Sequence, residues 1–217
     1  MIRYLVGTPY HGTMAKHIPT EGGLRRTKSA ERRAEILEHT ITLFAEQGTD
    51  ASLRAIGGAI GVSHAALRYY FASRDELLVE VYRSHENERR EQPAPRHASA
   101  VASMTRSAER NASIPGLVEL YATLTTDALH AARHPVTHEF ILNRFRRVRS
   151  ELSEKVRESQ LSGDLPADLD SEDVAALVTA ASDGLQLQWL VDPEAVDPRR
   201  SLALLDHLLQ PNEGPVL

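Results

Sequence analysis

The stretch Ala51-Ser-Leu-Arg-Ala-Ile-Gly-Gly-Ala-Ile-Gly-Val-Ser-His-Ala-Ala-Leu-Arg-Tyr-Tyr-Phe71 contains two short helical patterns separated by Gly61. Apolar residues recur at helical spacing on both sides of this glycine: Leu53, Ile56 and Ile60 before it, and Val62, Leu67 and Phe71 after it. Because these residues form one apolar side on each segment, the two helices can share a small core. The pattern predicts a helix-turn-helix.

The turn and the two helix starts have suitable residues. Gly61 falls where a short turn between steeply crossed helices needs a residue that tolerates positive φ. Ser63 can cap the second helix and Ser52 the first. The alternative, a purely structural helical hairpin, is disfavoured because the turn, the cap, the aromatic end and the following capping box agree at fixed spacing. Gly57 and Gly58 are unfavourable inside a helix by about 1 kcal/mol each, and either close packing or mobility could explain them.

Helical patterns also flank this pair. A helix is expected from about Ser29 to Gln47, ended by Gly48, with an inward stripe of Ile36, Leu37, Thr40, Ile41 and Phe44. After the pair, Ser73-Arg-Asp-Glu76 has the form of a capping box. It predicts a further helix with its core side at Leu77, Leu78, Val81 and Tyr82.

Five short motifs together resemble the tetracycline-repressor (TetR) family of transcriptional regulators, over roughly residues 29 to 82. They are Phe44-Ala45-Glu46-Gln47-Gly48, Ile56, Gly61-Val62-Ser63, Tyr70-Phe71 and Ser73-Arg74-Asp75-Glu76-Leu77-Leu78. The loop after Gly48 is one residue shorter than the family pattern, and Ala51 stands where threonine is common. The resemblance implies a DNA-binding domain followed by a variable helical regulatory domain.

The residues expected to contact DNA come from this resemblance and from their chemistry. Arg54 and Arg74 would meet phosphates from the two flanks, whereas His64, Ala66 and Arg68 are candidates for base edges. The full expected set is Lys28, Ser52, Arg54, Ser63, His64, Ala65, Ala66, Arg68, Tyr69, Tyr70 and Arg74.

Charge and composition agree with a DNA-binding N-terminal part. Although the chain of 217 residues has a net charge of −5, residues 1–90 hold 13 basic and 11 acidic residues, and residues 91–217 hold 12 and 19. The lack of cysteine excludes disulfides, zinc-thiolate sites and thiol catalysis. The sequence has neither a continuous apolar run of 18 residues nor an apolar signal-like segment before Thr27, so we expect a cytoplasmic protein.

The C-terminal part shows only helical signals, and its proline and glycine breaks predict four or five helices. Four are expected at about 115–132, 135–161, 171–191 and 198–209. We therefore expect an all-α protein with a flexible arm (1–27), a three-helix helix-turn-helix domain (28–72), a linking helix (73–91) and a ligand-sensing and dimerisation helical bundle (92–217). The break at Gln92-Pro-Ala-Pro-Arg-His97 is the expected domain boundary.

The last two expected helices indicate a partner. Their apolar residues spread round more than one face, so a single neighbour would leave apolar surface in water. A second copy of the chain could cover it, and the TetR resemblance implies a dimer built from these helices. The expected interface residues are Leu185, Gln188, Trp189, Leu205 and Leu208.

Few residues suggest other chemistry. His130, His134 and His138 are four apart, but Pro135 breaks their helix, so surface or capping histidines are favoured over a metal site. Asp183 needs a partner inside an apolar helix, either an arginine such as Arg144 or a polar or cationic ligand. The expected ligand-binding residues are Tyr121, Phe140, Arg144, Phe145, Asp183 and Gln186. No phosphate loop and no nucleophile with a base is present, so we expect no catalytic residue, metal or cofactor.

The sequence thus favours a homodimeric transcriptional repressor that binds a palindromic DNA operator. An unidentified small-molecule effector would release the repressor from this operator. Two alternatives remain. One is a helical-bundle enzyme using the region of His130, His138 and Asp183. The other is an architectural DNA-binding protein that responds to no ligand.

Overall fold

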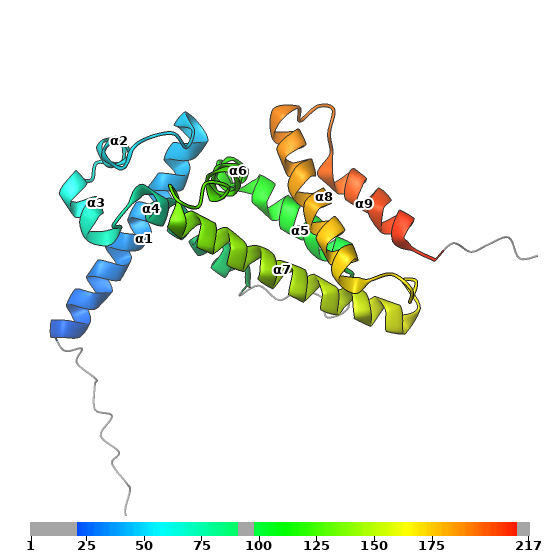
Figure 1. Cartoon of the computed structure of the whole chain (residues 1–217). Coiled ribbons are helices and arrows are strands. Elements are labelled where there is room, and N and C mark those ends of the chain that lie inside the picture. Colours follow the sequence, from blue (N-terminus) through cyan, green and yellow to red (C-terminus); the bar gives the residue numbers. More distant parts are fainter. Residues whose placement is uncertain (1–20, 91–97, 212–217) are drawn as a thin grey trace, which may run out of the picture.

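A computed structural model describes residues 21–90 and 98–211, and all regular structure within them is helical (Figure 1). The expected all-α class is therefore confirmed. The helices are α1 (Glu21–Gln47), α2 (Leu53–Ala59), α3 (His64–Tyr70), α4 (Arg74–Arg90), α5 (Ala100–Ser113), α6 (Leu117–Ala128), α7 (Pro135–Ser162), α8 (Ser171–Val191) and α9 (Pro198–Leu209).

Helices α1 to α3 form the N-terminal unit, hereafter the reading head, at one end of the molecule (Figure 1). The turn between α2 and α3 has Gly61 at φ +69°, as its position in the sequence predicts. Each helix is capped by the expected serine: Ala55 N donates to Ser52 Oγ (3.2 Å), and Ala66 N donates to Ser63 Oγ (3.1 Å).

The starts of α1 and α4 differ from expectation in detail. Helix α1 begins at Glu21 rather than near Ser29, so residues 21–27, expected in a flexible arm, are helical. The rest of that arm, residues 1–20, lies outside the described residues. At the start of α4, Glu76 N donates to Ser73 Oγ as a capping box requires. The returning bond, however, runs from Ala72 N to Glu76 Oε2 (2.7 Å).

The helices α5 to α9 make up the part of the chain that the sequence predicts to be regulatory, hereafter the regulatory domain, and their number among the described residues lies within the expected four or five. Helix α7 is 28 residues long and packs against α6 and α8. Aspartates cap the last two helices, Asp170 before α8 and Asp197 before α9. Among the described residues, α8 alone has the length and composition of a membrane span, a composition that core helices of soluble proteins share.

The apolar core is split between two clusters. The first joins the reading head to α4, α6 and the first turns of α7, ending at Phe140 and Ile141. The second joins α5, α8 and α9 to the rest of α7, beginning at Val148. The cores thus separate within α7, and the domain boundary expected at 92–97 lies outside the described residues.

The adjacent glycines of α2 have different environments. A Cβ on buried Gly57 would lie 2.6 Å from the Val62 carbonyl oxygen and 2.9 Å from Leu67 Cδ1, whereas a Cβ on Gly58 would meet nothing within 4 Å. Close packing therefore explains Gly57. Nothing in the structure requires glycine at position 58.

This contrast makes a paired prediction. Gly57→Ala should destabilise the protein by about 1–3 kcal/mol, because backbone atoms must shift. Gly58→Ala should stabilise it by about 0.5–1 kcal/mol, because alanine is the better helix former. Urea denaturation of both variants without DNA measures the two effects. Equal destabilisation by both would contradict the packing explanation.

Candidate nucleic-acid interface and regulatory core

Helix α3 exposes one face and buries the other. Leu67 is fully buried beneath it, whereas Tyr69 is 77% exposed and His64, Ala65 and Arg68 are also exposed. Ala66 and Tyr70 are half-buried at the edge of this face. An exposed helix with small residues at its start and arginine and tyrosine after them fits the major groove of DNA.

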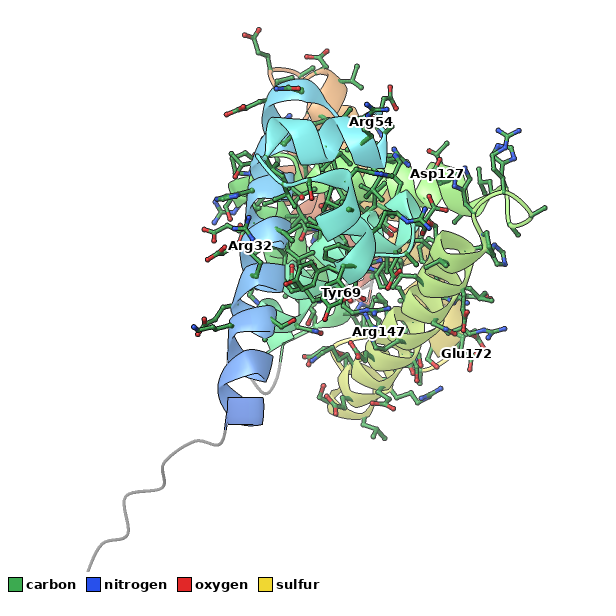
Figure 2. All side chains as sticks on the ribbon, turned by 90° about the vertical axis from the view of Figure 1, so that its left-hand side faces the viewer. Arg32, Arg54, Tyr69, Asp127, Arg147 and Glu172 are labelled. Carbon is green, nitrogen blue, oxygen red and sulfur yellow. The ribbon has the colours of Figure 1, made fainter. Side chains whose placement is uncertain are left out.

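The neighbouring expected DNA-binding residues also lie at the surface. Figure 2 looks onto the reading head, with Arg54 on α2 and Tyr69 on α3 in the foreground. Lys28 and Arg54 are exposed. Ser52 and Ser63 are exposed too, but their hydroxyls already serve as helix caps.

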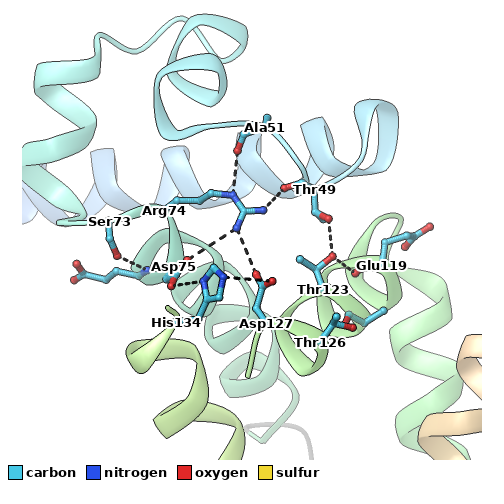
Figure 3. A network of polar contacts seen from close by, with 12 residues as sticks. Thr49, Ala51, Ser73, Arg74, Asp75, Glu119, Thr123, Thr126, Asp127 and His134 are labelled. Atoms are coloured by element: carbon cyan, nitrogen blue, oxygen red, sulfur yellow. Dashed lines mark hydrogen bonds and ion pairs between the residues drawn. The ribbon is translucent and has the colours of Figure 1, made fainter. Parts of the chain in front are cut away.

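Arg74 has a different environment from the other expected DNA-binding residues. Its guanidinium faces the protein interior (Figure 3): Nη2 donates to the Thr49 carbonyl (2.6 Å) and Nε to the Ala51 carbonyl (3.1 Å). Its third nitrogen, Nη1, lies 3.5 Å from Asp127 Oδ2 at the end of α6. Arg74 therefore joins the loop between α1 and α2 to the regulatory domain.

Asp75, Asp127 and His134 surround this arginine. His134 Nδ1 lies 2.9 Å from Asp75 Oδ2, and its Nε2 lies 3.8 Å from Asp127 Oδ1. Ligand atoms of the three residues lie within 4.8 Å of one another, a set that could hold a divalent cation. Each of them is already paired within the cluster, however, and the Arg74 guanidinium supplies a positive charge beside the two carboxylates.

The other two histidines of the predicted trio lie apart from this network. His138 Nδ1 bonds the Ala128 carbonyl (2.8 Å) at the end of α6, and His130 is exposed. Both fit the surface or capping histidines that the sequence favours. Asp183, the carboxylate of the enzyme alternative, bonds Tyr121 instead of either histidine.

A polar layer lies between the two apolar cores on α7. It consists of the buried residues Tyr82 and Glu86 on α4, Tyr121 on α6 and Arg144 on α7, and of the half-buried Asp183 on α8. Arg144 is 2% exposed; its Nε donates to Glu86 Oε1 (3.2 Å) and its Nη1 to the Tyr121 hydroxyl oxygen (2.8 Å). The Tyr121 hydroxyl in turn donates to Asp183 Oδ2 (2.9 Å). The pairing of Asp183 with Arg144, expected as direct, is made through Tyr121.

Aromatic rings complete the surroundings of Arg144. The guanidinium carbon lies 4.5 Å from the centre of the Tyr121 ring and 5.6 Å from that of Tyr82, and the two rings stack on each other. Both distances are typical of cation–π contacts. The layer is therefore two carboxylates and two tyrosines around one buried cation.

Burial changes the proton affinity of this layer. Loss of water around Asp183 raises the pKa of its carboxyl, and Arg144 only partly offsets this effect. Burial likewise raises the pKa of the Tyr121 phenol. For Arg144, burial alone would lower the pKa, but the neighbouring tyrosines and carboxylates outweigh it and raise the pKa, so the guanidinium stays charged.

The remaining expected ligand residues lie around the layer. Gln186 is buried on α8 and accepts a bond from Asn111 Nδ2 (2.9 Å). Phe140 packs edge-on against Tyr82, and Phe145 is half-buried against the first core. Glu86 is not among the residues expected from the sequence, although it follows Tyr82 by four residues on the core-facing side of α4, a spacing that could have revealed it.

Two cavities border the regulatory domain. A groove of about 330 Å³ between α4 and α7 is lined by Glu86, Phe140, Arg147 and five neighbours. A larger one of about 1010 Å³ lies among the starts of α5 and α8 and the ends of α7 and α9. Only the first touches the polar layer, because Glu86 lines it and also bonds Arg144.

Comparisons with known proteins place this architecture in a class. The profile of the N-terminal domain of bacterial regulatory proteins of the tetR family matches residues 36–81, and the profile of the C-terminal domain of BetI-type transcriptional repressors matches residues 126–211. No curated protein sequence matches the chain significantly.

Solved structures share the fold. A TetR-family transcriptional regulator from Rhodococcus sp. superposes with a TM-score of 0.69 at 22% identity, over 82% of this chain and 98% of its own. A transcriptional regulator from Saccharomonospora viridis in complex with choline gives 0.62 at 22% identity, over 82% and 95%. The ketosteroid regulator KstR2 of Mycobacterium tuberculosis gives 0.57 at 19% identity, over 83% and 95%.

The helix-turn-helix head on a helical domain defines a DNA-binding transcriptional regulator rather than an enzyme. With two profiles of one family matching its two halves in order, the chain belongs to the TetR family.

The raised pKa of Asp183 predicts a pH effect on stability. The folded carboxyl keeps its proton to higher pH than the unfolded one, so this contribution is fully present below the unfolded pKa of about 3.9 and is lost as pH rises through the folded pKa. Asp183→Asn still accepts the Tyr121 bond but cannot ionise. Its unfolding free energy should therefore fall less than that of the wild type above pH 4, as urea denaturation at several pH values would measure.

The pKa of Asp170 is shifted in the opposite direction to that of Asp183, so Asp170 provides a control for the pH effect. Backbone N–H groups of Asp173 and Glu172 lower its pKa, so its contribution is present above the unfolded pKa and is lost as pH falls through the folded pKa. Asp170→Asn should therefore reduce the loss of unfolding free energy at acidic pH. If Asp183→Asn and the wild type lose the same unfolding free energy as pH rises above 4, Asp183 ionises freely in the folded protein.

Proposed function

We propose that this chain is a ligand-responsive transcriptional repressor that binds a palindromic DNA operator as a homodimer and releases it when a small molecule enters the regulatory domain. The exposed face of α3, with Tyr69 and Arg68 above the buried Leu67, carries the proposal. As operator DNA lies in the bacterial cytoplasm, the protein would act there.

Operator binding follows from the chemistry of this face. His64, Ala66 and Arg68 lie on α3, which would enter the major groove, while exposed Arg54 and Lys28 would approach phosphates beside it. In a two-fold dimer the two heads would read an inverted repeat whose half-sites lie about one helical turn, or a multiple of it, apart.

Selection of binding sequences from random duplexes tests this function. The wild type should select an inverted repeat. Tyr69→Ala should weaken binding to that duplex by roughly 1–3 kcal/mol, because the substitution removes a hydroxyl and a ring from the face proposed to contact the major groove. Its unfolding free energy should stay unchanged, because Tyr69 is so exposed. Leu129→Ala, exposed at the end of α6, is a matched control. A selection without a two-fold motif would refute specific operator binding.

A second copy of the chain would cover the apolar side of α8 and α9. Leu204 is 58% and Leu208 69% exposed on α9, and Leu177, Leu187 and Val191 are exposed on α8. Of the expected interface residues, Leu185, Trp189 and Leu205 are half-buried, while Gln188 and Leu208 are exposed. Helices of this kind from two chains can form a four-helix bundle.

Charge placed on this surface should separate the dimer without unfolding the chain. Leu208→Asp puts an unpaired carboxylate into the proposed interface, but the side chain is already exposed in one chain. Sedimentation at micromolar concentration should show a wild-type dimer and a folded monomer for the variant. Leu129→Asp, an exposed leucine outside α8 and α9, should remain dimeric. A monomeric wild type would contradict the dimer.

The polar layer is the proposed effector site, because it joins α4, which carries the reading head, to α6, α7 and α8. A ligand that binds there can favour one head spacing over another only through unequal affinity for the two states. The groove between α4 and α7 offers an entry beside Glu86, and 330 Å³ lies within the usual range for small-molecule sites.

An organic cation is the proposed ligand class. The groove beside the layer is lined by the carboxylates of Glu86 and Glu139 and by the Phe140 ring, groups that attract a cation, and the Saccharomonospora viridis neighbour was crystallised with choline. Choline added to the operator complex should therefore release DNA, and the single tryptophan, Trp189 on α8, should change its fluorescence. Sodium chloride at equal ionic strength is the control. Equal release by both salts would exclude choline as the effector.

A further inference from the structure

We infer that Arg74 is a positioning residue: it fixes the loop between α1 and α2 against α6 and so sets α2 on the regulatory domain, instead of binding a DNA phosphate. This assignment rests on the proposed operator binding. It differs from the expectation, drawn from the family resemblance, that Arg74 meets a phosphate.

All three guanidinium nitrogens of Arg74 face protein acceptors. Two of them bond the carbonyls of Thr49 and Ala51, and the third approaches Asp127. The side chain is only 23% exposed. A guanidinium is a planar fork with fixed donor directions, so it cannot turn to a phosphate without leaving these acceptors. By contrast, Arg54 on α2 is exposed, so its guanidinium can reach a phosphate from the solvent side.

The loop that Arg74 holds leads directly into α2. Ala51, one of its acceptors, precedes Ser52, the cap of α2. The same loop has a second tie to α6, where the hydroxyls of Thr49 and Thr123 lie 2.6 Å apart (Figure 3). Thr123 and Asp127 are one turn apart on α6, so both ties end on the same short stretch of that helix.

Helix α6 also carries Tyr121 of the polar layer. Tyr121 precedes Asp127 by six residues, which is about 9 Å along a helix. A ligand that shifts Tyr121 would therefore move the anchor of Arg74 with it, because a helix moves as a rigid unit over this distance. We assign to Arg74 the contact through which movement of α6 reaches α2, in addition to the path through α4.

The salt dependence of operator binding separates positioning from phosphate binding. The slope of log K against log salt concentration is negative, and removal of one phosphate-binding cation by substitution makes it shallower by about 0.9, which is called a lowered slope here. Arg74→Ala should leave this slope unchanged and weaken binding at every salt concentration by roughly tenfold, because it removes hydrogen bonds made by a charged group. Arg54→Ala, the matched control, should lower the slope. Arg74→Lys, which keeps the charge, should weaken binding in the same way, since one compact ammonium cannot span acceptors that three separate guanidinium nitrogens reach.

Substitution of Asp127 and Thr123, the residues of α6 that hold the loop, complements the substitution of Arg74. Asp127→Asn and Thr123→Val lie on α6 and alter the two ties without changing the reading head. Each should weaken operator binding with an unchanged salt slope. The double variant Arg74→Lys with Asp127→Asn should lose less than the sum of the two single losses, because both break one contact.

Amide hydrogen exchange without DNA makes the test independent of operator binding. Arg74→Lys and Asp127→Asn should raise exchange at residues 53–57, where α2 begins, and leave Leu120 and Leu124 in the middle of α6 protected. Unchanged exchange at 53–57 would overturn the inference. Arg74→Lys with wild-type affinity, together with Arg74→Ala lowering the salt slope as Arg54→Ala does, would overturn it as well. If the wild type selects no duplex but the two variants show the expected rise in exchange, the proposed operator binding is refuted and the positioning role of Arg74 stands.

Discussion

The buried guanidinium of Arg144 is the constraint on which the arrangement of the regulatory domain depends. A charged group with 2% exposure is tolerated only when partners replace its lost water, and removal of one partner from such a pair costs about 3–5 kcal/mol. These partners are Glu86 on α4 and Tyr121 on α6, and the Tyr121 hydroxyl donates a further hydrogen bond to Asp183 on α8. Four helices must therefore keep one relative placement for the layer to remain satisfied. A helix that moves without the others breaks at least one hydrogen bond of the layer.

Helix α6 connects this layer to the reading head. Its start packs closely on α1: Gly116, at φ +82°, has no room for a Cβ, which would lie 2.8 Å from the Ala45 backbone nitrogen. Its middle carries Tyr121, and its end carries Asp127 beside Arg74. Because the first apolar core also runs without interruption from the reading head to α6 and the start of α7, the head is packed directly on the regulatory domain. The division into a reading part and a sensing part is thus one of function more than of packing.

The agreement between sequence and structure is best where interactions are local. Ser52 and Ser63 cap their helices, Gly61 has the positive φ of the turn, and the expected inward stripe of α1 from Ile36 to Phe44 is buried. At Asp183 the agreement is partial. A buried carboxylate needs a donor, which the sequence indicates, but Tyr121 between it and Arg144 depends on where α6 crosses α7. Sequence reasoning overlooked Glu86 because its charge suggests a solvent-exposed residue until its position beside Tyr82 on α4 is considered.

The sequence by itself determined the helical class, the helix-turn-helix and the family, because caps, turns and apolar spacing act within about one helical turn of chain and leave a pattern in the letters. Only the tertiary structure decided the direction of Arg74. Its acceptors at Thr49 and Ala51 lie 25 and 23 residues away, and Asp127 lies 53 residues away. No local rule relates such positions. An arginine at the start of a helix beside the recognition helix has the same local sequence whether it points to DNA or into the protein. The packing of α6 against the α1–α2 loop supplies the acceptors that turn it inward.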